Sequence, residues 1–270
     1  MRNIHSVDAV RIFRRRLGLS ARALWVAAFG VVALIGSLAV FGGATEDVTQ
    51  HNGLATHDAA RLHLFTIHRS DLVVRLSKVL SSIGDPPVLA VLALVVGFLF
   101  WRRGLRLALA LAPSIALGVS AVSVALTKAI VGRARPPVSL HLVAESDYSF
   151  PSGHATDSAA VCIAIAIVLA VFVLRHPIAR LASVFAGASL VGAIGTSRLI
   201  LGVHWPSDVL AGWALGVGIS LAVTITAAVF ARLTPPPIER ASERRRSLAR
   251  LTRLFTLQRR VHHQDLGTAA

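Results

Sequence analysis

The sequence predicts an all-α integral membrane protein, a bundle of six transmembrane helices with an amphipathic interfacial helix between spans 1 and 2. Two observations lead to this fold class. The chain of 270 residues is 54% hydrophobic and only 15% charged, whereas soluble domains carry about 25% charged residues. Its apolar residues are also gathered in long runs rather than in amphipathic periods, and such runs fit a bilayer-spanning helix.

Six apolar runs are long enough, or nearly so, to cross a bilayer. They are Ala23–Phe41, Pro86–Trp101, Leu105–Thr127, Thr156–Leu174, Leu181–Thr196 and Val209–Phe230. The first exceeds the apolar region of a signal peptide, about 7–15 residues. We therefore interpret it as an uncleaved span, with a cleaved signal as the alternative. The predicted domains are a basic N-terminal tail at 1–20, a membrane domain at 21–232 and a basic C-terminal tail at 233–270.

The polar stretch between the first two spans, Thr45 to Asp85, contains the predicted amphipathic helix. Its apolar residues recur at helical spacing, with Arg69 interrupting the stripe, and Thr56 or Asp58 is suited to cap its start. The stripe consists of Leu62, Phe65, Leu72, Leu76, Val79 and Ile83. Nearby histidines are spaced six and five apart, so they do not stack on one helix face as metal ligands would. They are His57, His63 and His68.

The basic residues set the expected orientation. If six helices alternate, both tails and the loops 102–106 and 175–180 fall on one Arg-rich side, which the positive-inside rule makes cytoplasmic. We expect a multi-pass protein of the inner (plasma) membrane with both termini cytoplasmic. The net charge of +15 comes with little aromatic interleaving, so the expected partners are membrane lipids rather than nucleic acid.

Three polar clusters lie at the outward ends of apolar runs. They occupy residues 128–136, 151–154 and 197–208. Ionisable side chains at membrane depth are costly, at about 2.5–3.5 kcal/mol near the bilayer centre, so we interpret these clusters as functional. Taken singly, each residue has an ordinary alternative, since basic side chains anchor helix ends and Asp208 could merely cap a helix.

Together the clusters can bind a phosphate. Lys128, Arg135 and Arg198 supply positive charge, and guanidinium groups bind phosphate oxygens in a bidentate fashion. Ser152 and Gly153 stand where the fourth span begins, and a helix N-terminus presents backbone N–H groups to an anion. The Ser152 hydroxyl is a further donor, and glycine permits close approach of the anion to the backbone.

His204 and Asp208 are four residues apart, and Pro206 between them suits the first turn of a helix that His204 would enter. A carboxylate bonded to one ring nitrogen fixes the tautomer and leaves the other nitrogen free to attack phosphorus. His154 is the candidate acid that protonates the departing oxygen. Arg133 is a further candidate phosphate contact, and Glu145, Asp147 and Tyr148 are candidates for shaping substrate entry.

In this order and at these spacings, the clusters resemble the signatures of the type 2 phosphatidic acid phosphatase superfamily: K-x6-R-P, then P-S-G-H, then S-R-x5-H-x3-D. Residues 128–208 match every fixed position. The resemblance implies that His204 forms a phosphohistidine, that Asp208 orients it, and that His154 acts first as acid and then as base. It also implies a metal-free and cofactor-free reaction, with the phosphoryl group held by Lys128, Arg135, Ser152, Gly153 and Arg198.

The leading hypothesis is a membrane phosphatase that hydrolyses the phosphomonoester or diphosphate of a lipid at the extracytoplasmic face. Candidate substrates by resemblance are polyprenyl diphosphate, such as undecaprenyl diphosphate, phosphatidic acid and phosphatidylglycerol phosphate. A lipid phosphotransferase using the same phosphohistidine and a non-catalytic lipid-binding relative are the alternatives. A transporter is disfavoured because the charges gather at one membrane face rather than at the midplane. The sequence sets no oligomeric state.

Overall fold

The computed structural model describes residues 21–233. The predicted N-terminal tail lies outside the described residues, as does the predicted C-terminal tail except for Leu233. Within the described residues, the chain divides into two units after Ala228. The fold described below is that of the first unit.

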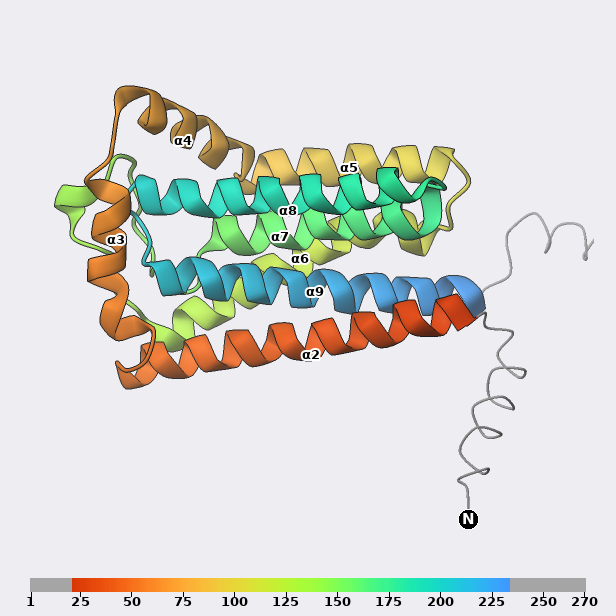
Figure 1. The fold of residues 1–270 in the computed structure, drawn as a ribbon, viewed down its shortest axis with the longest axis horizontal. Coiled ribbons are helices and arrows are strands. Elements are labelled where there is room, and N and C mark those ends of the chain that lie inside the picture. The colour runs from red at the N-terminus through yellow and green to blue at the C-terminus, as the bar shows by residue number, and fades with distance from the viewer. Residues whose placement is uncertain (1–20, 234–270) are drawn as a thin grey trace, which may run out of the picture. The chain divides into compact units, whose positions relative to one another are not determined.

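All regular structure among the described residues is helical (Figure 1). Each predicted span corresponds to a helix, and several helices continue beyond the apolar run, because polar residues at the ends still join the backbone hydrogen bonding. The main helices are α2 (Ala21–Gln50), α3 (Asp58–Thr66), α4 (Asp71–Ile83), α5 (Pro86–Arg102), α6 (Leu107–Val131), α7 (Gly153–Val168), α8 (Pro177–Ile200) and α9 (Pro206–Leu233). Short 3₁₀ turns occupy Ala55–His57 and Val138–Leu140, and a π-helical turn, Leu169–Val173, continues α7.

Five helices are long and apolar enough to cross a membrane: α2, α6, α7 with its π-helical turn, α8 and α9. A sixth span results if α4 and α5, which meet at a bend of 56°, are counted together. Large apolar side chains such as Phe29, Phe98 and Phe185 are exposed on the outer surfaces of these helices. So much exposed apolar surface suits hydrocarbon rather than water, and the chain is a multi-pass helical membrane protein.

The sequence predicted one continuous amphipathic helix before the second span, and this is wrong because the segment forms two helices. The stripe is divided between α3 and α4, and the break falls at Arg69. The Arg69 side chain lies between the two helices in the sequence, and its guanidinium donates to the backbone carbonyls of Ile200 (2.7 Å) and Leu140 (3.0 Å). The two halves also face different ways, since Leu62 of α3 is buried and Leu76 of α4 is exposed.

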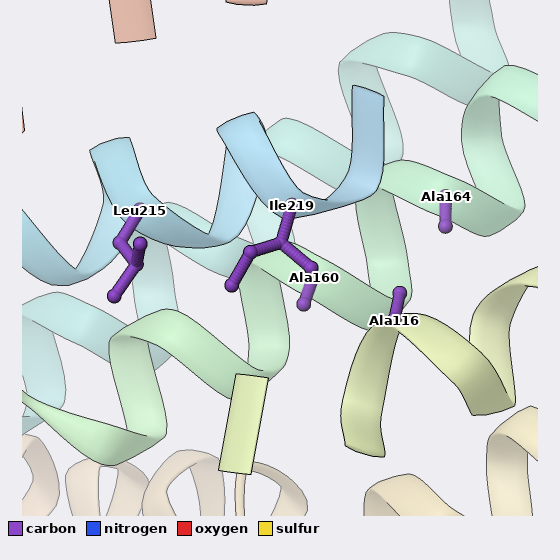
Figure 2. Close-up of a cluster of buried hydrophobic side chains, with 5 residues drawn as sticks. All are labelled: Ala116, Ala160, Ala164, Leu215 and Ile219. Atoms are coloured by element: carbon purple, nitrogen blue, oxygen red, sulfur yellow. The ribbon is translucent and has the colours of Figure 1, made fainter. Parts of the chain in front are cut away.

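Small residues let α6, α7 and α9 pack closely. Figure 2 shows Leu215 and Ile219 of α9 lying over alanines of α7 and α6, and this cluster is buried. The closest approach is at Gly216, where a Cβ would stand 2.3 Å from the carbonyl oxygen of Thr156 on α7. Small residues at such contacts are typical of helix association in membranes. The register between α7 and α9 is therefore fixed by backbone contact.

The ends of α6 and α8 and the beginnings of α7 and α9 gather at one end of the bundle, where α3 crosses (Figure 1). The backbone N–H of Ser152, at the start of α7, donates to the carbonyl of Asp208 in the first turn of α9 (3.1 Å). The three polar clusters predicted from the sequence all lie on these segments.

Candidate active site

His204 lies in the short turn between α8 and α9 and is almost completely buried. Gly202 makes this turn possible: its φ is +73°, and a Cβ there would come within 2.2 Å of the Leu140 carbonyl oxygen. Nε2 of His204 lies 3.1 Å from Nη1 of Arg135. A guanidinium can only donate, so Nε2 is the unprotonated ring nitrogen and accepts through its lone pair. Burial, followed by the positive charges of Arg135 and Arg198, lowers the pKa of His204 well below its usual value, so the ring is neutral.

The other ring nitrogen of His204, Nδ1, faces Asp208 at 3.5 Å from Oδ2. Asp208 is fully buried in the first turn of α9. Its Oδ2 accepts from the backbone N–H of Trp205 (2.8 Å), and its Oδ1 accepts from Nη1 of Arg133 (2.5 Å). His204 therefore stands just before the helix that carries Asp208, as predicted, and the carboxylate is held from two sides.

Arg133 does not belong to the cation cluster of the site; it bridges two buried carboxylates instead. Its Nη2 donates to Oδ2 of Asp58 at 2.7 Å, while its Nη1 donates to Oδ1 of Asp208. Asp58 also accepts from the backbone N–H of Ser207 (3.0 Å). Sequence reasoning assigned Asp58 only a possible capping role. An isolated aspartate at a helix start carries no signal that it pairs with a residue 75 positions later.

The three predicted phosphate-binding cations meet two carboxylates from the loop before α7. Glu145 pairs with Nη2 of Arg135 (3.2 Å) and with Arg198, and Asp147 pairs with Lys128 and Arg135. Burial alone would raise the pKa of Glu145, but Arg198 and Arg135 outweigh it and leave that pKa lowered. For Asp147, hydrogen bonds from Lys128 and Arg135 outweigh burial and lower the pKa to about 2. Both carboxylates are ionised at neutral pH.

Apart from Nδ1 of His204, which lies 3.5 Å from Oδ2 of Asp208, two buried donors at the site have no hydrogen-bond partner within the described part of the chain: Oγ of Ser152 and Nε of Arg198. Ser152 is the N-cap residue of α7 but makes no side-chain cap bond. Next to it, a Cβ on Gly153 would meet only Val124, at 3.8 Å, so the start of the helix is uncrowded. Unpaired buried donors are costly, and a bound anion would satisfy them.

His154, the predicted acid, is the second residue of α7. Its Nε2 lies 2.9 Å from Oδ1 of Asp85, at the junction of α4 and α5. Sequence reasoning missed Asp85 because it lies 69 residues from its partner. The charges of Arg198 and Glu145 act on both His154 and His204, so the two histidines share one electrostatic environment.

All eight predicted site residues therefore lie at one end of the bundle. They are linked through shared partners, from His204 through Arg135 and Glu145 to Arg198, and from Asp208 to Ser152. Tyr148, predicted to shape substrate entry, is exposed. Between residues 21 and 233, no group of three or more His, Cys, Asp or Glu side chains is arranged to hold a metal ion.

The fold and the site define a polytopic helical membrane protein with a buried histidine set among basic side chains. Residues 103–232 match the PAP2 superfamily. The chain carries a PAP2 superfamily domain, and the resemblance stated from the three motifs is confirmed.

Curated relatives match parts of this chain. Lipid A 1-phosphatase of Rhizobium johnstonii is 39% identical over 119 residues, which is 40% of this chain and 42% of that protein. Phosphatidylglycerophosphatase B of Bacillus subtilis is 40% identical over 90 residues, 32% of this chain and 42% of that protein. Decaprenylphosphoryl-5-phosphoribose phosphatase of Mycobacterium tuberculosis is 33% identical over 101 residues, 36% of this chain and 50% of that protein. The alignments thus span half or less of each relative.

A solved structure shares the fold over a longer stretch. The transmembrane PAP2 type phosphatidylglycerolphosphate phosphatase from Bacillus subtilis superposes with a TM-score of 0.62 at 22% identity. The superposition covers 76% of this chain and 97% of that one. It extends the likeness beyond the matched segment to most of the helical bundle.

Proposed function

We propose that this protein is a metal-independent membrane phosphatase that hydrolyses the phosphomonoester or diphosphate of a lipid through a phosphohistidine on His204. The observation that carries the proposal is the state of the His204 ring. Its Nδ1 faces Asp208 and its Nε2 lone pair points at Arg135, in a cluster where Ser152 and Arg198 have buried, unpaired donors. A neutral, oriented imidazole beside anion-binding groups is suited to attack phosphorus.

In the first step, the Nε2 lone pair of His204 attacks phosphorus and the bond from phosphorus to the leaving oxygen breaks. The departing oxygen takes a proton from His154. The negative charge on the transferring phosphoryl oxygens is stabilised by Lys128, Arg135 and Arg198, together with the N-terminus of α7. Asp208 stabilises the positive charge that develops on the His204 ring.

In the second step, His154 accepts a proton from a water molecule, whose oxygen attacks the phosphohistidine. The bond between phosphorus and Nε2 breaks, its electron pair returns to His204, and inorganic phosphate leaves. The same residue thus serves as acid and then as base, so each turnover restores both histidines.

The proposed substrate class is a phosphate or diphosphate on a lipid. This class is supported by the three relatives, which are a lipid A 1-phosphatase, a phosphatidylglycerophosphatase and a decaprenylphosphoryl-5-phosphoribose phosphatase. Polyprenyl diphosphate, phosphatidic acid and phosphatidylglycerol phosphate are the substrates to test. An active site at one end of a membrane bundle allows the headgroup to reach it while the tails stay in the bilayer.

The proposed topology has six spans within residues 21–232, with α5 as the second span. A position of α4 in the membrane interface is supported by its exposed stripe of Leu72, Leu76 and Val79, with Arg75 and Lys78 exposed beside it. Both basic termini lie on the cytoplasmic side of the inner membrane, and the active site faces the opposite side.

The test is phosphate release by the detergent-purified protein from a panel of lipid phosphates, with and without EDTA. We expect release that survives EDTA, is inhibited by vanadate and is abolished in His204→Ala. His63→Ala, which removes an exposed histidine of α3, is the matched control and should keep full activity. Activity retained in His204→Ala would refute the mechanism, and loss with EDTA would refute metal independence.

The same assay separates the alternatives. Radiolabelled phosphate that appears on an added acceptor lipid, rather than in water, identifies a phosphotransferase. Lipid binding without any turnover across the panel identifies a non-catalytic relative.

A further inference from the structure

Asp85 is an aspartate at a helix start that does not cap its helix. It is the N-cap residue of α5, yet its side chain makes no cap hydrogen bond. Such a carboxylate normally accepts from the N–H of the second or third helical residue. Here Pro87 is the second helical residue and has no N–H to donate, so only that of Val88, the third, is available. The carboxylate instead accepts from Nε2 of His154 at 2.9 Å.

The junction of α4 and α5 is fitted closely to the His154 ring. The helices bend by 56° between Ile83 and Pro86. At Gly84, an added Cβ would stand 2.6 Å from Cγ2 of Ile194 and 3.2 Å from Cδ2 of His154. Because Ile194 is fully buried, it cannot yield easily. Glycine therefore allows the bend to approach the ring, and the bend carries Asp85 to it.

We propose that Asp85 is a positioning residue for His154, an inference that rests on the proposed phosphatase function. An ionised carboxylate can only accept, so Nε2 of His154 bears the proton that faces Asp85. This leaves Nδ1 as the nitrogen that exchanges a proton with substrate. In the first step the bond between Nδ1 and its proton breaks as the proton joins the departing oxygen. In the second step Nδ1 accepts a proton from water, and Asp85 stabilises the imidazolium that results.

The arrangement gives each histidine its own carboxylate: Asp208 for the nucleophile and Asp85 for the acid. The other charged groups that act on His154 are Arg198 of α8 and Glu145 of the loop before α7. Those two are paired with each other. Asp85 is thus the carboxylate whose hydrogen bond is directed at His154 itself.

The test compares two leaving groups in single-turnover experiments. The alkoxide of phosphatidic acid needs a proton to depart, whereas nitrophenolate from nitrophenyl phosphate does not. In Asp85→Asn we expect phosphohistidine formation from phosphatidic acid to slow by about 10-fold or more. The burst of nitrophenolate should stay within about twofold of wild type, because that step does not use the acid. Asp71→Asn, at an exposed position in the first turn of α4, is the matched control with wild-type rates.

Equal losses with both leaving groups would show a purely structural role and overturn the proposal, as would no loss with either. A second comparison uses His154→Ala, in which Asp85→Asn should add no further loss on phosphatidic acid; an additional loss would also overturn it. A wild-type protein that releases phosphate from no substrate refutes the proposed function itself, and that result is obtained before any variant is measured.

Discussion

Replacing Arg133 with methionine tests whether the active site depends on a charge that is paired with two buried carboxylates. Arg133 joins Asp58 of α3 to Asp208 of α9, with N–O distances of 2.7 and 2.5 Å. The aspartate side chains are 3% and 0% exposed, and that of Arg133 is 16% exposed. Methionine keeps much of the length and the apolar stem but removes both ion pairs. It leaves two buried carboxylates without their shared cation.

The expected cost follows from what each carboxylate keeps. Asp58 retains the backbone N–H of Ser207 and Asp208 retains that of Trp205, so neither loses every donor. Each loses one charged hydrogen bond, worth about 1.5–3 kcal/mol. Breaking a buried ion pair from one side costs about 3–5 kcal/mol. We therefore expect Arg133→Met to lower the free energy of unfolding by about 3–5 kcal/mol.

The assay is unfolding by SDS in mixed micelles, followed by tryptophan fluorescence. Trp205 is a local probe, since its ring lies 5.6 Å from the Arg133 guanidinium carbon. Arg61→Met, at an exposed position on α3, is the control and should change stability by less than about 0.5 kcal/mol. Adding Asp58→Asn to Arg133→Met should restore part of the loss, because one unpaired charge disappears. A loss below about 1 kcal/mol in Arg133→Met would refute the reasoning.

Three further predictions follow from the site and its supports. Gly216→Val should lower both stability and phosphate release, because its Cβ would lie 2.3 Å from the Thr156 carbonyl; thermal unfolding in detergent measures the first. The pKa of His204 is lowered by burial and then by Arg135, so activity should persist as pH falls below 6.5, and Arg135→Gln should move the acid limb of kcat/KM to higher pH. Glu145→Gln should tighten inhibition by inorganic phosphate about 2- to 5-fold, because a competing carboxylate leaves Arg198 and Arg135, whereas Glu46→Gln, exposed on α2, should leave it unchanged.

The helices were predictable because a bilayer demands long apolar runs, and those runs are visible in a single sequence. The ends of the helices were less predictable. Helix α2 continues past Phe41 to Gln50 and α8 past Thr196 to Ile200, because backbone hydrogen bonding rather than hydropathy determines where a helix ends. The break between α3 and α4 was missed, although Ser70 marks the start of α4 by accepting from the backbone N–H of Val73. The second contact at the break, from Arg69 to the Ile200 carbonyl, joins segments distant in the chain and has no local signal.

That the predicted site residues would gather was expected from the three motifs, because residues proposed to act on one phosphate must lie at one end of the bundle. His204, Asp208 and Arg135 meet as expected. Asp58 and Asp85 were not recognised in this role, since a single aspartate at a helix start has an ordinary explanation as a cap. Only the folded chain shows that one binds Arg133 and the other His154.

These supporting residues have a common location. The PAP2 match covers residues 103–232, and the three motifs all lie within it, whereas Asp58, Arg69 and Asp85 precede it. Each of them bonds to a residue within the matched segment. Asp58 accepts from Arg133, Arg69 donates to the carbonyl of the last residue of α8, and Asp85 accepts from His154. The matched segment therefore carries the groups proposed to act on phosphate, and α3 with the junction of α4 and α5 holds them in place. A chain shortened to the matched residues would keep every motif and lose a carboxylate partner of Arg133 and the one bonded to His154.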